Sequence, residues 1–336
     1  MPKDSFTFTD IKKIFNDGIP KTTFLDAERA GNIPPSRRIE YGNVTRRAWD
    51  YSVIGKIGEK YGYLDKPKNP SCVTLFSTKG GVLKSTIVLN IARMYGLHNV
   101  KTCVIDLDPQ GDTSRNLGLD IDDPNPDLDS VNEYFDVLPS LMQLYDGKLP
   151  LEDIIQNTEI TGLDVVPSSS SLIPLMDLLN SKKRREYWLK ENVVEPLYKL
   201  GYDLVIIDLA PSWTLYTSMA ITSADLLISP IECKVAHYRN VNEFIRQLDQ
   251  FASEMKIEDQ KRIFVPTKVT SSKKISMQIL NSYNKNIEHC SYSSIRETII
   301  GEEAIALKQS IIEYKPTSPI SEDIKALLQQ INTELK

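Results

Sequence analysis

The sequence predicts an α/β protein, with parallel strands flanked by helices and a small helical domain in front of them. Residues 72–76 are apolar and lead through a glycine-containing loop into an apolar segment of helical length, which gives the order strand, loop, helix. Residues 202–211 contain an unbroken apolar run, as expected of a strand buried on both faces of a parallel sheet. Residues 1–64 instead show two short helical patterns around a turn.

Composition and charge are typical of a globular protein that is soluble in water. The chain has 336 residues, of which 25% are charged and 41% hydrophobic, which is enough for one large core and a smaller one. The net charge of −5 excludes a uniformly basic nucleic-acid coat protein. We recognise no signal peptide and no membrane-spanning run, and the four cysteines form no C-x-x-C pair. We therefore expect a cytoplasmic protein with reduced thiols.

Residues 1–65 are predicted to form a domain similar to a helix-turn-helix. Helical patterns at residues 9–15 and 21–30 flank a short turn that contains glycine and proline. Residues 33–38 and 43–49 are expected to form a basic wing and a third helix. The whole would then be a small winged helix-turn-helix.

The charge of this domain favours contact with a polyanion. Residues 1–70 hold 13 Lys and Arg against 9 Asp and Glu, whereas the remainder of the chain is acidic. DNA contact is the favoured role, and a structural or dimerisation role is the alternative. The predicted DNA contacts are Lys21, Thr22, Arg37, Arg38, Arg46 and Arg47.

A linker at residues 66–70 leads to the most informative stretch, residues 77–86, with the sequence STKGGVLKST. Its place between a strand and a helix is that of a phosphate-binding loop, which disfavours a chance Gly-Gly turn. Glycines let backbone N–H groups approach a phosphate chain, and the start of the helix adds its positive dipole end. Lys84 can reach the β- and γ-phosphates of a nucleotide, and the Ser85 hydroxyl can coordinate Mg²⁺.

The loop differs from the generic pattern G-x-x-x-x-G-K-[ST] at two positions, because Leu83 replaces the second glycine and Lys79 adds a second lysine. It matches K-G-G-x-x-K-[ST] and thereby resembles the deviant Walker A motif of the ParA/MinD family of ATPases. Family members with an additional N-terminal DNA-binding region often replace that glycine. The resemblance implies nucleotide contacts by Lys79, Gly80, Gly81, Val82, Leu83, Lys84, Ser85 and Thr86.

Two further motifs follow in the order expected of this family. The string D-x-D-P-Q-G resembles its switch I box, in which Asp108 would orient and help deprotonate the attacking water and Asp106 would lie near Mg²⁺. The apolar run that ends at Asp208 matches a Walker B carboxylate, which holds Mg²⁺ through water. Carboxylates at the ends of parallel strands face the ligand crevice. Turn capping is the alternative for the aspartates of the D-x-D string.

Strands are also predicted at residues 224–230 and 262–268. The resemblance implies that the second of them ends at the adenine pocket, which assigns Pro266 and Thr267 to the base, although apolar packing is also expected there. Basic residues near these strand ends would carry sequence-independent DNA binding in the ATP-bound dimer, or would simply be exposed on loops. They are Lys234, Arg239, Lys268, Lys273 and Lys274.

Three other segments are assigned to the surface or to the core. The acidic, proline-rich residues 120–130 and the basic residues 182–185 are predicted to be solvated, with a DNA or partner patch as the alternative for the basic run. Residues 321–331 form an amphipathic helix with the spacing of a core helix and without flanking lysines. We therefore expect no membrane contact from this helix.

Over residues 71–336 the resemblance implies a P-loop NTPase fold, with a doubly wound, mostly parallel sheet. It further implies an ATP-bound homodimer in which Lys79 contacts the partner's nucleotide, and slow ATP hydrolysis that requires Mg²⁺. The expected partners are nonspecific nucleoid DNA, a ParB-type centromere-binding protein and, for the N-terminal domain, operator DNA. Two other functions stay open: a repressor switched by nucleotide, and a MinD-like division-site regulator, which the C-terminal helix disfavours.

Overall fold

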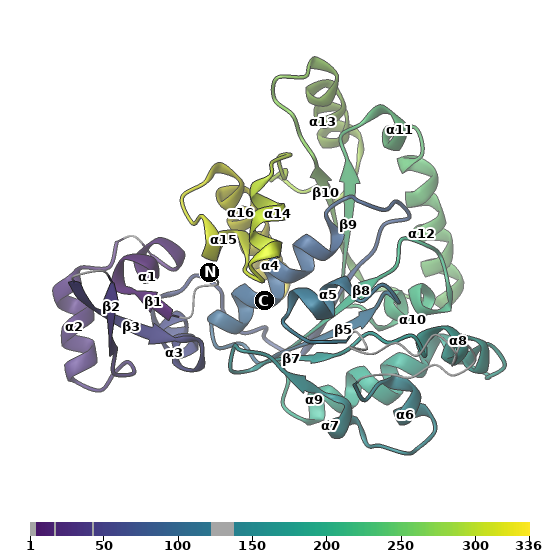
Figure 1. Ribbon diagram of the computed structural model, residues 1–336. Helices are drawn as coiled ribbons and strands as arrows, with labels where there is room; N and C mark the ends of the chain where they lie inside the picture. Colours follow the sequence, from purple (N-terminus) through teal and green to yellow (C-terminus); the bar gives the residue numbers. More distant parts are fainter. Residues whose placement is uncertain (1–4, 17, 42–43, 122–137) are drawn as a thin grey trace, which may run out of the picture.

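The computed structural model describes residues 5–16, 18–41, 44–121 and 138–336. Figure 1 shows a large α/β body with a smaller N-terminal unit at its side. Residues 122–130 of the acidic segment and Asn43 of the predicted third helix lie outside the described residues.

A seven-stranded sheet forms the centre of the body, in the order β10-β9-β4-β8-β5-β7-β6. All neighbouring strands are parallel except β6 and β7. Strands β4, β5, β7, β8 and β9 are buried at every residue, because helices cover both faces. The predicted doubly wound, mostly parallel sheet is therefore confirmed. The strands are β4 (Ser71–Leu75), β5 (Thr102–Leu107), β6 (Gln156–Asn157), β7 (Leu163–Val166), β8 (Leu204–Leu209), β9 (Leu226–Glu232) and β10 (Lys261–Thr267).

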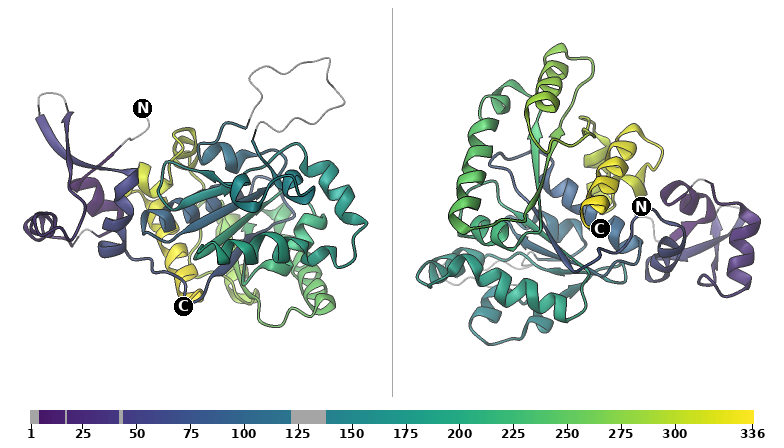
Figure 2. Two further views of the ribbon diagram at one scale, coloured as in Figure 1. Left: turned by 90° about the horizontal axis from the view of Figure 1, so that it is seen from below. Right: turned by 180° about the vertical axis from the view of Figure 1, so that it is seen from behind.

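Two hydrophobic cores lie on the two faces of this sheet. On β8, Leu204 and Ile206 enter one core, whereas Val205 and Ile207 enter the other. Helices α4 and α14–α16 cover the first face, and α8–α10, α12 and α13 cover the second, as the views in Figure 2 show. The helices of the body are α4 (Lys84–Leu97), α5 (Asp112–Asn116), α6 (Leu141–Tyr145), α7 (Leu151–Ile154), α8 (Leu172–Asn180), α9 (Glu195–Lys199), α10 (Leu215–Ser223), α11 (Val235–Tyr238), α12 (Val241–Met255), α13 (Lys274–Asn286), α14 (Ile300–Ala306), α15 (Ile311–Tyr314) and α16 (Pro319–Glu334).

Two irregular helical stretches precede α9: a 3₁₀ turn at Arg185–Tyr187 and a π-helical segment at Lys190–Val194. The C-terminal helix α16 buries the apolar face predicted for it, including Ile324, Leu327 and Ile331, in the first core. Among the described residues, no helix combines the length and the apolar character that crossing a membrane requires.

The N-terminal unit combines three helices with a three-stranded antiparallel sheet in the order β1-β3-β2. Its elements are β1 (Ser5–Thr7), α1 (Phe8–Ile14), α2 (Lys21–Arg29), β2 (Arg37–Tyr41), β3 (Val44–Asp50) and α3 (Tyr51–Tyr61). The first two helices lie where the sequence predicts helices. The domain boundary predicted at residues 66–70 stays a prediction.

The predicted third helix at residues 43–49 is wrong, because residues 44–50 form strand β3 of a hairpin. Val44 and Thr45 are β-branched, which favours a strand, and the partner strand β2 supplies the hydrogen bonds. The Trp49 side chain is buried, and its indole N–H donates to the carbonyl of Pro34 (2.8 Å). The third helix of the unit is α3, which begins only at Tyr51.

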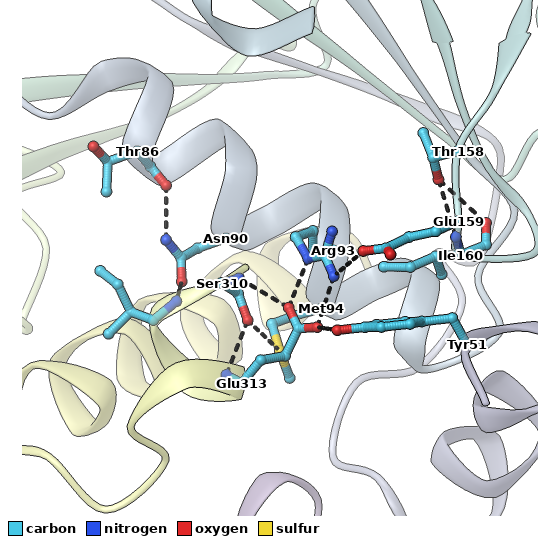
Figure 3. Close-up of polar contacts among 11 residues, drawn as sticks. Tyr51, Thr86, Asn90, Arg93, Met94, Thr158, Glu159, Ile160, Ser310 and Glu313 are labelled. Carbon is cyan, nitrogen blue, oxygen red and sulfur yellow. Dashed lines mark hydrogen bonds and ion pairs between the residues drawn. The ribbon is translucent and has the colours of Figure 1, made fainter. Parts of the chain in front are cut away.

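The N-terminal unit packs directly on helix α4. A Cβ added to Gly58 of α3 would lie 1.8 Å from the carbonyl oxygen of Leu97 at the end of α4. The two helices are so close at this point that only glycine fits at position 58. The Tyr51 hydroxyl donates to Glu313 (2.9 Å), and Glu313 accepts a further bond from Arg93 Nε of α4 (2.7 Å), as Figure 3 shows. The unit therefore connects to the helix that follows the phosphate loop.

The same helix is bonded along its length to the C-terminal helices. Asn90, in the second turn of α4, donates to the carbonyl of Thr86 (2.8 Å) and accepts from the N–H of Ile311 (2.9 Å) (Figure 3). Arg93 also pairs with Glu159 (2.8 Å), which follows strand β6. Helix α4 thus joins the phosphate loop, the N-terminal unit and the C-terminal segment.

Candidate nucleotide-binding site

The loop between β4 and α4 contains two residues in the left-handed conformation. Gly81 has φ of 69°, and Leu83 has φ of 71° at the position where the generic motif has its second glycine. A side chain in this conformation costs on the order of 1 kcal/mol. Leu83 therefore adopts the backbone conformation that a glycine would have at this position of the loop. Helix α4 begins immediately afterwards, so its first N–H groups, which have no partner within the helix, lie at the loop.

Lys84 lies between the loop and the carboxylates at the sheet edge. Its side chain is only 8% exposed, and its Nζ is 3.5 Å from Asp208 Oδ1. Asp106 on β5 stands opposite Asp208 on β8 in the strand register, and both carboxylates are buried. Burial, followed by the charge of Asp208, raises the pKa of Asp106 above its usual value. Two adjacent buried carboxylates favour a cation beside them.

The oxygen donors at this edge fit Mg²⁺, which prefers oxygen ligands and retains several waters. The Ser85 hydroxyl at the start of α4 and the carboxylates of Asp106 and Asp208 come from three neighbouring elements. Within the described residues, no group of three or more His, Cys, Asp or Glu could hold a metal by itself. When bound, the phosphates of a nucleotide and waters would complete the metal's coordination.

Asp108 begins the turn that leaves this edge. Its side chain is partly exposed, and Oδ1 accepts only the local N–H of Gln110 (3.0 Å) among the bonds of the described chain. The Ser168 hydroxyl donates to the backbone carbonyl of Asp108 (2.5 Å), which fixes the turn to the residues after β7. The carboxylate thus stays accessible while its backbone is held, which suits a group that handles a water proton.

Helix α5, which follows this turn, is bonded to both buried carboxylates. Thr113 Oγ1 donates to Asp208 Oδ2 (2.6 Å). The N–H and the hydroxyl of Ser114 both donate to Asp106 Oδ2 (2.8 and 2.7 Å). The sequence analysis did not predict a role for Thr113 and Ser114. Their position directly after the D-x-D-P-Q-G string was the one feature that could have indicated that they lie near the site.

Lys79 is held within its own chain by Glu232, the last residue of β9. Glu232 is buried and also pairs with Lys234 (2.9 Å) and Lys268 (3.8 Å). Burial raises the pKa of Glu232, but the hydrogen bonds from Lys79 and Lys234 more than offset this and leave the pKa below its usual value. Lys79 therefore rests on a carboxylate that no sequence motif indicated, and its contact with a partner's nucleotide stays a prediction.

A small cavity of about 110 Å³ opens beside the start of α4, next to Thr86 and Leu83. Lys268, Arg296 and Glu297 line its other side, and Arg296 is fixed by two bonds to Asp323 (2.6 and 2.8 Å). The side chains of Pro266 and Thr267, which the sequence assigns to the base, are buried and do not line this cavity. The segment around Arg296 carried no sequence signal for a site, because it has neither periodicity nor a motif.

The predicted DNA contacts fall into two regions. In the N-terminal unit, Lys21 and Thr22 are exposed at the start of α2, and the four arginines lie on the exposed hairpin. Arg37 pairs with Asp50 (2.6 Å), and Arg47 pairs with Glu28. In the body, Arg239, Lys273 and Lys274 are exposed, whereas Lys234 and Lys268 contact Glu232.

Comparison with known proteins decides the family. A family model described as an AAA domain matches residues 71–261, which is more than half of the chain. The chain belongs to this AAA domain family. Together with the relatives described below, this confirms the likeness to ParA-type proteins that the phosphate loop predicts.

Similar proteins and structures extend this result. The chromosome partitioning protein ParA of Caulobacter vibrioides is 29% identical over 179 residues, which cover 53% of this chain and 62% of that protein. A solved structure described as a partition protein has a TM-score of 0.66 at 18% identity, over 99% of this chain and 93% of that chain. Cobyrinic acid a,c-diamide synthase from Mycobacterium smegmatis, with bound ATP analogue and magnesium, has a TM-score of 0.55 at 25% identity, over 70% of this chain and 93% of that chain.

Proposed function

We propose that this protein is a ParA-type partition ATPase, which binds ATP and Mg²⁺ at residues 77–86 and dimerises in that state. The observation that carries the proposal is the placement of two lysines in one loop. Lys84 is buried beside Asp208, where it can serve the chain's own nucleotide. Lys79 is 39% exposed and is paired with Glu232, and it would have to leave this carboxylate to reach the nucleotide of a second copy.

The chemistry follows from the residues around the loop. Ser85, Asp106 and Asp208 would hold Mg²⁺, which neutralises charge on the β- and γ-phosphates when bound. Lys84 would hold the same phosphates, and Asp108 would orient the attacking water and accept its proton. A positive charge supplied in trans raises related phosphoryl-transfer rates about 10³- to 10⁵-fold. If Lys79 supplies it, hydrolysis is slow until the dimer and a ParB-type partner are in place.

The ATP-bound dimer would bind nucleoid DNA without sequence preference, through exposed basic residues of the body such as Lys273 and Lys274. Hydrolysis would then release the DNA, so the rate of hydrolysis would set how long the protein stays bound. The similarity to the chromosome partitioning protein ParA of Caulobacter vibrioides supports a role in partition. The ATP analogue and magnesium bound to the cobyrinic acid a,c-diamide synthase of similar fold support the binding of ATP and Mg²⁺.

Co-sedimentation with random-sequence DNA tests the proposal. The wild type should pellet with DNA in the presence of ATP and Mg²⁺, and should stay in solution with ADP or without nucleotide. Binding should weaken steeply between about 50 and 200 mM salt, because it depends on phosphate contacts. Lys84→Ala should not pellet, whereas Lys285→Ala, which changes an exposed lysine at the far end of α13, should behave like the wild type. Binding that is independent of nucleotide or of salt would contradict the proposal.

A repressor switched by nucleotide is the second candidate, and the N-terminal unit favours it. Helix α2 presents Lys21 and Thr22 at its exposed start, and the β2–β3 hairpin carries four arginines beside it. A helix start next to a basic hairpin is an arrangement that can read operator DNA. Operator binding that survives Asp108→Ala, together with loss of ATP turnover, would show that the chain combines both functions.

A further inference from the structure

Helix α5 contacts the metal-binding edge through hydrogen bonds to both of its buried carboxylates. Its residues Thr113 and Ser114 are at most 1% exposed, and each donates to a different carboxylate. No surface role accounts for two adjacent hydroxyl groups that are buried against acidic side chains. Both hydroxyls point toward the site that the proposed function uses.

We propose that Thr113 and Ser114 are positioning residues for the magnesium–nucleotide site, an inference that rests on the proposed function. Each hydroxyl donates to Oδ2 of its carboxylate and so restricts the direction of the Oδ1 atom, which in Asp106 accepts the N–H of Asp108 (3.2 Å). In Asp208 this Oδ1 is the atom that faces Lys84, at 3.5 Å. The two hydroxyls therefore hold the carboxylates ready for a metal ion before the metal binds.

Ser114 additionally connects the metal-binding edge to the turn of Asp108. Its hydroxyl oxygen accepts from the N–H of Ser168 (3.0 Å), and the Ser168 hydroxyl donates to the carbonyl of Asp108 (2.5 Å). One chain of bonds thus runs from Asp106 through Ser114 and Ser168 to the backbone of Asp108. The N–H of Asp108 also donates to Asp106 Oδ1 (3.2 Å), so the backbone of Asp108 is tied to the Asp106 carboxylate both directly and through the two serines.

The contribution of a hydroxyl that orients a metal ligand has a known scale. Loss of such an outer partner lowers metal affinity about 10- to 100-fold. Thr113→Val removes the one hydrogen bond that, in the described structure, joins Thr113 to Asp208. We therefore expect the loss of Mg²⁺ affinity to span this whole range. Ser114→Ala keeps the backbone N–H bond to Asp106, so we expect a smaller effect, at the lower end of this range.

Titration of AMPPNP binding against MgCl₂, measured by calorimetry, tests the inference. The Mg²⁺ concentration at half-maximal effect should rise about 10- to 100-fold in Thr113→Val. Nucleotide affinity in EDTA should stay within about twofold of the wild type, since Thr113 contacts a carboxylate and not the phosphate loop. Thr113→Ser restores the hydroxyl and should restore the Mg²⁺ dependence of the wild type.

Thr102→Val is the matched control for loss of a buried hydroxyl. Thr102 is buried like Thr113, but it lies at the start of β5, at the end of the strand away from Asp106, and its hydroxyl donates to the carbonyl of Val100 (2.9 Å). Thr102→Val should leave the Mg²⁺ dependence of AMPPNP binding unchanged. This control separates the loss of a positioning hydroxyl from a general loss of stability. Ser114→Ala retains one bond and so provides a folded variant if Thr113→Val fails to fold.

The outcomes separate this inference from the proposed function. Wild-type protein that binds AMPPNP with Mg²⁺, together with Thr113→Val and Ser114→Ala variants of unchanged Mg²⁺ dependence, would overturn the inference alone. Wild-type protein that does not bind AMPPNP at any Mg²⁺ concentration would overturn the proposed function. A raised Mg²⁺ requirement in both variants, with rescue by Thr113→Ser, would support the inference.

Discussion

Replacing Glu313 by glutamine tests how the N-terminal unit is held on helix α4 (Figure 3). Glu313 and Arg93 form an ion pair in which both side chains are at most 1% exposed. Once the carboxylate charge is gone, the charged partner of Arg93 that remains in the described structure is Glu159, which is 48% exposed. Leaving one member of a buried ion pair uncompensated costs about 3–5 kcal/mol. Glutamine still offers an oxygen to Tyr51, so we expect the lower end, about 3 kcal/mol.

Equilibrium unfolding in urea, followed by circular dichroism, measures this change. The free energy of unfolding should fall by about 3 kcal/mol with an unchanged dependence on urea. Glu303→Gln is the matched control, because Glu303 pairs with Lys315 at the surface of the neighbouring helices, and it should leave the unfolding midpoint where it is. A Glu313→Gln effect no larger than that of the control would refute the reasoning.

Three further predictions concern pH, catalysis and DNA. His98 is buried between Phe15 and Tyr63, and burial lowers its pKa to about 4 from 6.5. Between these values the unfolded chain binds a proton that the native protein does not, so stability should fall as the pH drops from 6.5 to 4, by up to about 3 kcal/mol. His98→Gln should remove this dependence when unfolding is compared at pH 5 and pH 7. Asp108→Ala should retain AMPPNP binding and lower ATP turnover about 10²- to 10⁴-fold in a phosphate-release assay, and undiminished turnover would exclude Asp108 from the chemistry. Arg38→Ala, on the exposed hairpin, should weaken DNA binding equally for all sequences and reduce the salt slope by about 1, whereas a loss confined to one sequence would indicate a base contact instead.

The sheet and the phosphate loop could be predicted because their signals are local. The apolar run before Asp208 requires burial on both faces wherever it occurs, and the loop from Lys79 to Lys84 carries its chemistry within six residues. Even the departure from the generic motif was informative, since Leu83 adopts the left-handed conformation that glycine would otherwise supply. Local patterns therefore give the architecture and the place of the site.

The features that sequence reasoning missed depend on partners that are distant along the chain. Arg93 and Glu313 are 220 positions apart, and Lys79 and Glu232 are 153 apart. No periodicity connects such pairs, because a buried charge selects its partner only after the strands and helices have packed. Strand β3 is a similar case. Its residues have a local spacing compatible with a helix, but pairing with β2 across the hairpin stabilises a strand instead.

Complementation between two inactive variants tests the central claim, that the two lysines of one loop serve two copies of the chain. Lys79→Ala and Asp108→Ala should each bind ATP and hydrolyse little of it. In a mixed dimer, the site on the Lys79→Ala subunit keeps Asp108 and receives Lys79 from the other subunit. Random mixing in equal amounts should therefore restore about one quarter of the wild-type turnover. A mixture that dimerises with ATP and yet remains as inactive as either variant alone would contradict the account.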